Sequence, residues 1–334
     1  MKSSLITVVT TSVLAFLTAC GGGGASGDAP SQPGATKVAI SSANQDKVVR
    51  ASVNAGMAVS LTQNSTGGAT TAGVASRAHA LSTVLQRAVA ASQDKRKNIA
   101  SASAHPAAAM SDTQACGVSG TLTITLDDRD GNSILSNGDV ITASFAQCKD
   151  SATSSVDGAL SITLTGTPTD THFTASASFQ NVAVDDNGVQ STIAGNVTVS
   201  ETDMASVIET TLSVGSGGLT ASTSSASYND AVTFAAGFVI KIDESASGTL
   251  SVTMAGTMTA QSVGGAITIS TPQPLVQTSS DDYPSSGQVV ITGAAGSALR
   301  ATVVPNAQVK LDLDANGDGA YESTATVAWT TLSA

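Results

Sequence analysis

Aromatic side chains are scarce in this sequence. They make up only 3% of the 334 residues, with one Trp and three Tyr. Proteins that bind sugars or nucleic-acid bases by stacking need clustered aromatic rings, which so few residues cannot supply in number. Charged residues are also few, at 12%, and the net charge at pH 7 is −11. The composition therefore argues against carbohydrate-stacking and nucleic-acid-binding functions.

Long apolar runs are also missing after Cys20. No later run approaches the length of roughly 18 residues that a membrane-spanning helix requires. The hydrophobic content is nevertheless 41%, enough to bury a sizeable core, and Ser, Thr, Ala, Gly and Val dominate the rest. This composition is typical of secreted proteins rich in β-structure.

Catalytic motifs are absent as well. The sequence has no Gly-x-Ser-x-Gly elbow, no His-Glu-x-x-His pair, no glycine-rich phosphate loop and no cysteine metal cluster. His172 is the only histidine after residue 105, and Ser92 and Lys95 fit a Ser-x-x-Lys spacing without its partner motifs. We therefore expect no catalytic residues and no enzyme. A hydrolase that uses acidic residues at strand ends is the alternative.

The N-terminus, as far as Cys20, looks like an export signal. Lys2 precedes an apolar stretch, residues 5–17, which is too short to span a bilayer. It closes with Leu17-Thr18-Ala19-Cys20, which resembles the lipobox of bacterial lipoproteins. The resemblance implies that residues 1–19 are a cleaved signal peptide and that Cys20 carries acyl chains such as palmitate, which anchor the protein in a membrane. A plain secretory signal with a coincidental cysteine is the alternative.

The residue after this cysteine indicates in which membrane the protein is anchored. Gly21 stands where lipoproteins retained in the inner membrane of enterobacteria have aspartate, so the resemblance implies the outer membrane, on its periplasmic face or at the cell surface. The chain as a whole resembles the uncharacterised β-rich lipoproteins of Gram-negative bacteria. Besides the lipobox, the resemblance rests on a Pro-Ser-Ser-Gly-Gln-Val-Val-Ile-Thr-Gly run from Pro284 and an Asp-x-Asp-x-Asn-Gly-Asp-Gly run from Asp312.

Two segments separate the signal from the body of the protein. Residues 20–73 are rich in Gly, Ser, Ala and Thr, and we expect a mostly disordered, lipidated tether. Residues 74–104 predict a helix, because their apolar residues recur at helical spacing: Leu81, Val84, Leu85, Ala88 and Val89. The helix is basic through Arg77, Arg87, Lys95, Arg96 and Lys97. It either packs against the β domain or lies on a membrane surface.

Residues 116–334 predict an acidic β domain. They hold 21 acidic and five basic residues, whereas residues 1–115 are net basic. Their apolar residues alternate with Ser and Thr, as at Leu122-Ile124-Leu126, Leu160-Ile162-Leu164 and Val309-Leu311-Leu313. Turn signals such as Gly215-Ser216-Gly217-Gly218 fall between the runs. We expect a mainly β fold with a dozen or more strands in a long antiparallel meander, barrel-like or rolled; a β-sandwich is the alternative.

The cysteines are only three. Once the resemblance assigns Cys20 to lipid, Cys116 and Cys148 remain as a pair in an exported, oxidising setting. We expect a disulfide between them, and two free buried thiols are the alternative.

Two acidic segments are candidate calcium loops. Residues 128–139 resemble the twelve-residue loop of EF-hands in the spacing of their oxygen donors, which are Asp128, Asp130, Asn132, the backbone of Ile134, Ser136 and Asp139. Ser133 replaces the usual glycine and Asp139 the usual glutamate, and the flanks are strands. A polar hairpin loop without metal is the alternative.

The second segment resembles the Asp-x-Asp-x-Asp-Gly loops of extracellular calcium proteins. Its candidate ligands are Asp314, Asn316, Asp318 and Glu322. The alternative is a tight hairpin at Asn316-Gly317, with Asp312 and Asp314 on the solvent side of the preceding strand. Calcium is the one cofactor that the sequence suggests.

Together these observations predict a lipid-anchored outer-membrane protein. Its β domain is expected to be a non-enzymatic structural or binding module, with calcium as the candidate stabilising ion and an unknown protein or ligand of the cell envelope as partner. The second hypothesis is a carrier that encloses an apolar ligand such as lipid within the curled sheet.

Overall fold

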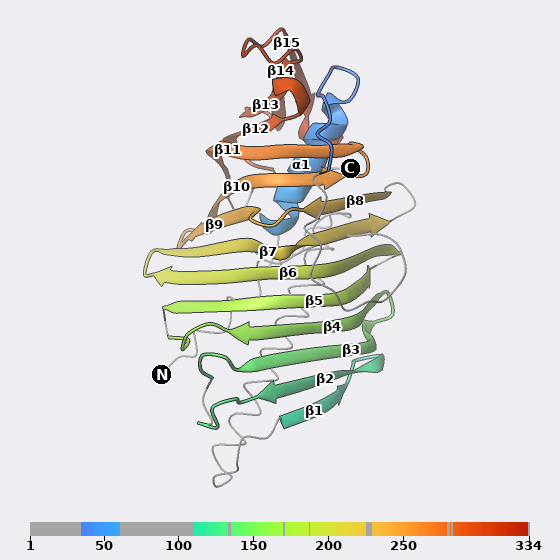
Figure 1. Cartoon of the computed structure of the whole chain (residues 1–334), viewed down its shortest axis with the longest axis vertical. Coiled ribbons are helices and arrows are strands. Elements are labelled where there is room, and N and C mark those ends of the chain that lie inside the picture. Colours follow the sequence, from blue (N-terminus) through green and yellow to red (C-terminus); the bar gives the residue numbers. More distant parts are fainter. Residues whose placement is uncertain are drawn as a thin grey trace.

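The computed structural model of the chain describes residues 35–60 and 110–332, except residues 133–134, 170, 187, 225–228, 279–280 and 282. The strands succeed one another along the longest axis, from β1 at one end to β15 at the other (Figure 1), and α1 packs against β10, β12 and β13. No helix within these described ranges has the length and apolar character needed to cross a membrane.

Fifteen strands and three short helical segments make up the described chain. Their bounds are α1 Gln45–Ser60, β1 Met110–Ala115, β2 Ser119–Asp127, β3 Val140–Ser151, β4 Ser154–Leu164, β5 His172–Asp186, β6 Val189–Met204, β7 Val207–Ser224, β8 Asn229–Phe234, β9 Val239–Ser245, β10 Thr249–Ala260, β11 Gly265–Thr278, β12 Ser286–Thr292, the 3-10 turn Ala294–Gly296, β13 Ala298–Val304, β14 Gln308–Asp314, β15 Ser323–Ala328 and α3 Trp329–Leu332.

All the described strands belong to one antiparallel sheet. Each pairs with the next along the chain, and the one exception is at β8 and β9, which share the gap between β7 and β10. The first half of β7 pairs with β9 and its second half with β8, and β10 divides in the same way. The predicted antiparallel meander is confirmed, and a two-sheet sandwich is not what forms. In the strand order β1 and β15 stand at the two ends.

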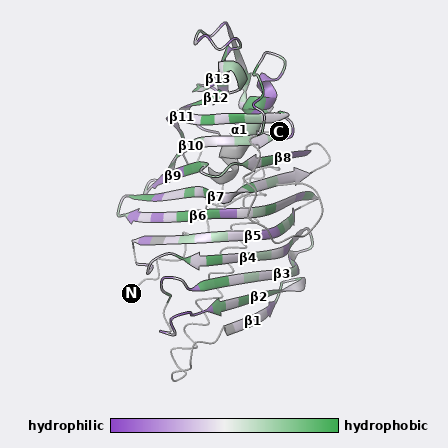
Figure 2. Cartoon of the chain, viewed as in Figure 1, coloured by the Kyte–Doolittle hydropathy of each residue, from purple (hydrophilic) through white to green (hydrophobic). Residues whose placement is uncertain are grey.

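One face of the sheet is apolar and buried. In β4 the side chains of Leu160, Ile162 and Leu164 are buried, and the intervening Ser and Thr are half-buried. The same alternation recurs in β2, β6, β10 and β13, and Figure 2 shows hydrophobic and hydrophilic residues interleaved along the strands. Alternation arises because successive side chains of a strand point to opposite faces. The strand predictions made from this pattern are therefore confirmed.

Irregular pairing interrupts the strands near their middles. Register shifts occur between β3 and β4, β4 and β5, β5 and β6, and β6 and β7. Such bulges add a residue to one strand and increase the local twist. Phe179 and Val182 are both buried although an odd number of positions separates them, because the bulge between them restores the phase of the apolar face. Gly158, with φ of +107°, sits opposite one bulge, and a Cβ there would lie 2.6 Å from the Asn181 carbonyl oxygen.

The glycine-rich segment at residues 215–218 marks a change of partner within a strand. We expected a turn there, but the segment lies inside β7, and that prediction is wrong. Glycine is common at bulges inside strands as well as in turns, because it tolerates close approach of another backbone. Gly218 has φ of +73° and lies where β7 leaves β9 and begins to pair with β8.

An N-terminal segment covers one end of the apolar face. Val38 donates its N–H to Ala266 in β11, and Ala294 donates to the Val38 carbonyl, at 3.1 and 2.7 Å. Ile40, Val48 and Val49 are 0–1% exposed in the same core as the strands. Residues 35–60 thus differ from the tether expected over residues 20–73, because a few apolar side chains in polar sequence suffice to fasten the segment to the sheet.

The C-terminal helix joins this cover. Trp329 and Leu332 of α3 are 1% exposed, and the Trp329 ring stacks on Tyr283 with ring centres 6.0 Å apart. Arg50 of α1 donates a hydrogen bond of 2.8 Å to the Thr331 carbonyl. The two ends of the described chain thus pack together over β10–β15. The predicted helix at residues 74–104 and the signal at residues 1–19 lie outside the described residues.

Candidate functional site

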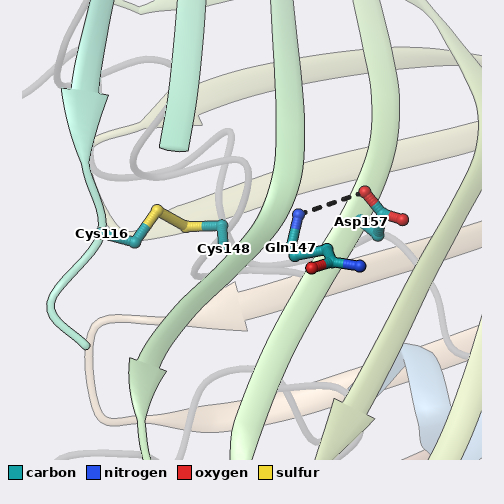
Figure 3. The surroundings of a disulfide bond; sticks show 4 residues. All are labelled: Cys116, Gln147, Cys148 and Asp157. Atoms are coloured by element: carbon teal, nitrogen blue, oxygen red, sulfur yellow. Dashed lines mark hydrogen bonds between the residues drawn. A yellow bond between two sulfur atoms is a disulfide. The ribbon is translucent and has the colours of Figure 1, made fainter. Parts of the chain in front are cut away.

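A disulfide joins Cys116 to Cys148, as predicted, with Cα atoms 5.4 Å apart (Figure 3). Cys116 lies between β1 and β2, and Cys148 is buried in β3. The residue before Cys148 is Gln147, whose φ of +47° belongs to the bulge, and its backbone N–H donates to Asp157 at 3.2 Å. The bond therefore holds the outermost hairpin of the sheet to the first bulged strand.

The first acidic loop connects β2 and β3. Its anchor is Asp139, only 1% exposed, which accepts hydrogen bonds from the backbone N–H groups of Arg129 and Ser136 at 3.0 and 2.7 Å. Asp128 accepts from the Gly131 N–H at 2.8 Å. These bonds fold the loop back on itself, and the Leu164 N–H, which donates to the Asp139 carbonyl, ties it to β4.

Asp130 is the exposed member of this loop. It accepts hydrogen bonds from the Ser136 hydroxyl at 2.7 Å and from both nitrogens of Asn132, at 3.1 Å from the backbone and 2.7 Å from the side chain. The Ser136 bond, followed by the backbone bond from Asn132, lowers the pKa of Asp130. Hydrogen bonds stabilise the charged form of a carboxyl, so Asp130 is an anion at neutral pH. The structure thus brings five of the six predicted ligands into one loop, and Ile134 lies outside the described residues.

The second acidic loop connects β14 and β15. Asp314, 3% exposed, accepts hydrogen bonds from the Gly317 and Gly319 N–H groups at 2.7 and 2.9 Å. Asp318 accepts from the Ala320 N–H, and Glu322 from the Ala315 N–H at 3.0 Å. The connection is a folded loop, residues 315–322, so the tight two-residue hairpin does not form.

Asp312 and Asp314 are buried, so the expectation that they face solvent is wrong. Arg300 donates two hydrogen bonds to Asp312, Lys310 lies 3.0 Å from it, and the Thr324 hydroxyl donates at 2.7 Å. Desolvation raises the pKa of Asp312, but the bonds from Thr324, Lys310 and Arg300 outweigh it and hold the pKa at about 2. Arg300 also stacks over the Tyr321 ring, 4.1 Å from its centre.

Each loop gathers three carboxylates whose oxygens lie within 4.8 Å of one another. The groups are Asp128, Asp130 and Asp139, and Asp314, Asp318 and Glu322. Closely spaced carboxylate oxygens repel each other and form the donor set that hard divalent cations prefer. Both clusters can hold a metal ion. The side-chain N–H groups of Asn132 and Asn316 and the Ser136 hydroxyl donate hydrogen bonds to these carboxylates, and the same three side chains supply neutral oxygens to the loops.

The remaining candidates lie apart from these loops. His172 is exposed at the start of β5, where its ring nitrogens bond to Thr202 and Thr174 at 3.2 Å. A hollow of about 410 Å³ opens over β3–β6, and its lining includes Lys149, Asp157 and Asp185. Charged and other polar side chains line it beside Ala183 and Val184. Cys20, Ser92 and Lys95 lie outside the described residues.

Sequence reasoning missed two arrangements of charge. The contact of Arg300 with Asp312 joins β13 to β14, and Lys310 contacts the same carboxylate from within β14. The sequence signal for both was the acidic residue inside an otherwise alternating strand. Glu201 is 7% exposed on the apolar face of β6, and its Oε2 has no hydrogen-bond partner among the described residues. An acid at an inward position of an alternating strand was the available signal.

No protein-family model, no curated protein and no solved structure matches this chain.

Proposed function

We propose that this chain is an outer-membrane lipoprotein whose β domain is a non-enzymatic structural or binding module, with calcium held in its two acidic hairpin loops. The observation that carries the calcium part is the clustering of three carboxylates in each loop around one buried aspartate, Asp139 or Asp314. The anchoring part is supported by the sequence from Leu17 to Cys20, which resembles a lipobox.

Calcium suits these loops better than a catalytic metal. The donors are all oxygens, and neither loop contains histidine or cysteine, which zinc and copper prefer. Calcium takes six to eight oxygens in flexible geometry, and backbone carbonyls and water complete such sets. Asp139 and Asp314 also accept hydrogen bonds from backbone N–H groups of their own loops. A bound ion would therefore stiffen the connection between two strands, which is a structural and not a catalytic role.

Thermal melting of the full mature chain tests the calcium part. The midpoint should rise when millimolar calcium replaces a chelator, and magnesium should raise it less, since Mg²⁺ demands nearly octahedral geometry. The double variant Asp130→Asn and Asp318→Asn should lose most of the calcium response while keeping the chelator midpoint. A midpoint that is the same with calcium and with chelator would rule out both loops as calcium sites.

Mass spectrometry of the mature chain tests the anchoring part. We expect a diacylated or triacylated cysteine at the new first residue and recovery of the protein in the outer-membrane fraction. The Cys20→Ser variant should remain unacylated and leave that fraction, whereas Cys116→Ser should change folding stability but not the acylation. An unmodified Cys20 in the native chain would contradict the proposal.

The proposed partner of the module is a protein or a ligand of the cell envelope. The two alternative functions, a lipid carrier and a hydrolase, have less support. A lipid carrier needs an apolar cavity, whereas the hollow over β3–β6 has Lys149, Asp157 and Asp185 in its lining. A hydrolase needs two carboxyl groups that face each other across a cleft. Chemical crosslinking in intact cells, followed by purification of the anchored protein, would identify the partner, and a chain recovered without any crosslinked partner would favour a purely structural role.

A further inference from the structure

The apolar face of the sheet is buried over most of its length. Cross-strand pairs connect its side chains in rows that run from strand to strand, as in Ile141, Ile162 and Ala177. In β4 and β6, Leu160 and Ile193 are 0% and 1% exposed. A single sheet buries one face only when a second layer lies on it. The half of the sheet from β2 to β7 therefore has a cover.

The described helices do not supply this cover. α1 packs against β10, β12, β13 and α3, and α3 packs against α1 and β15. The main contacts of β2–β6 are with their neighbouring strands. Within the described ranges, the second layer thus lies over one end of the sheet, and the layer over β2–β7 must come from elsewhere.

Charge at the inner face points to a basic partner. Glu201 lies on the same face as Asp203, two positions further along β6, and as Glu244 of β9, which pairs with Ile208 of β7. Burial, then the charges of Asp203 and Glu244, raise the pKa of Glu201 to about 7, and its Oε2 lacks a hydrogen-bond partner among the described residues.

The opposite face of the same strands already holds a cation among its acids. Lys241 of β9 lies 2.8 Å from Glu209 and 3.5 Å from Asp243. On the inner face, Glu201 is instead buried beside groups of its own charge. A cationic group that entered from the inner side would stabilise the Glu201 carboxylate.

The chain between α1 and β1 has to run from one end of the sheet to the other. α1 ends at Ser60 over β10–β13, and the next described element, β1, begins with Met110 at the far end of the strand order. With strands roughly 4.8 Å apart, the path from β12 to β1 is on the order of 50 Å. Residues 74–104, predicted from sequence as a helix, would be about 46 Å long. Their apolar row and their five basic side chains match an apolar face with an acidic edge.

We propose that the inner face of β2–β7 is the docking surface for residues 74–104 of the same chain. Their apolar row, centred on Leu85, lies on the apolar strands, and one of their basic side chains pairs with the edge formed by Glu201, Asp203 and Glu244. The basic segment is then the second layer of the β domain, a property independent of the anchoring and calcium proposals.

Photocrosslinking in the full mature chain tests this docking. A benzophenone amino acid at position 85 should attach to inward-facing residues of β2–β7 in the same copy of the chain. The matched control is position 83, which lies on the opposite side of a helix with this apolar row, and its yield onto these strands should be at least about fivefold lower. Attachment of the position-85 probe to a differently labelled copy, or equal attachment from both positions, would overturn the proposal.

Hydrogen exchange supplies a second measurement. In the variant Leu81→Ser with Leu85→Ser, amides of residues 74–104 should exchange at least about tenfold faster than in the parent chain. Amides of β10, β12 and β13, which α1 contacts, should be unchanged. Thr83→Ser is the control and should leave all rates unchanged. Fast exchange of residues 74–104 in the parent chain would contradict docking.

Discussion

The two ends of the sheet are stabilised by different means, although their strands have the same alternating pattern. From β10 to β15 the strands are mostly short, and the described residues of α1 and α3 cover their apolar face. From β2 to β7 the strands lengthen, and a disulfide ties the outermost hairpin to β3, whereas bulges with positive-φ glycines occur in both halves. Each end also carries one acidic loop. The alternating pattern therefore specifies the strands, and other features stabilise each end: packed helices at one and a disulfide at the other.

The largest expected effect is at the covered end. Trp329→Ala removes a fully buried ring that stacks on Tyr283, and we expect a loss of about 3 to 5 kcal/mol in the free energy of unfolding. Urea unfolding measures the loss. Exchange rates should rise in α1 and β11–β13 and remain low in β4–β6. The exposed neighbour Thr330→Ala is the control, and an equal loss there would contradict the role of the ring.

The disulfide is the corresponding test at the other end. It closes a loop with a sequence separation of 32 residues, which in the chain-entropy model contributes about 3 to 4 kcal/mol. The double variant Cys116→Ser and Cys148→Ser should unfold at a correspondingly lower urea concentration. Exchange in β1–β3 should rise first. A chain in which β11–β13 loosen as much as β1–β3 would show that the two ends are not separate units of stability.

Alanine substitutions at Gly158, opposite the bulge in β5, and at Gly166 separate the cost of a steric clash from the cost of a positive φ. In Gly158→Ala the new Cβ would meet the Asn181 carbonyl, and we expect a loss of about 2 to 3 kcal/mol. Gly166→Ala is the matched control, because Gly166 also has a positive φ, of +80°, but nothing lies within 4 Å of its Cβ position. The control should cost about 1 kcal/mol. Equal losses in urea unfolding would show that the close approach contributes nothing.

These contrasts mark how far the sequence could predict the structure. The strands, the antiparallel order and the grouping of both acidic loops followed from local patterns, because alternation and spacing are properties of neighbouring residues. The disulfide followed from the count of cysteines once Cys20 was assigned to lipid. Ile40 and Val49 could not be recognised as core residues, since the strands of their core, β10–β13, are distant from them in the sequence. The burial of Asp312 likewise depends on Arg300 from another strand and Thr324 from a third.

The ionic contacts of Asp312 in β14 predict a loss of stability in acid at the covered end. Asp312 has a folded pKa of about 2 against an ordinary value of 3.8, so its charged form is stabilised in the folded state. That contribution, about 2 kcal/mol, is present above pH 4 and is lost as the pH falls from 4 to 2. Asp312→Asn should remove it at neutral pH and flatten the acid limb of stability against pH. An acid limb of unchanged slope would contradict the lowered pKa.

The acidic loops give the smallest expected effect and test whether the two ends respond separately. With a dissociation constant of about 0.1 mM, calcium at about 1 mM would stabilise each loop by about 1.4 kcal/mol. Asp130→Asn should remove the response of β2 and β3 to calcium in hydrogen exchange and leave that of β14 and β15, and Asp318→Asn should do the reverse. Both loops close hairpins in one continuous sheet, so this independence is not guaranteed by the topology. If either variant abolished both responses, calcium would act on the sheet as a whole, and the two ends would form one cooperative unit.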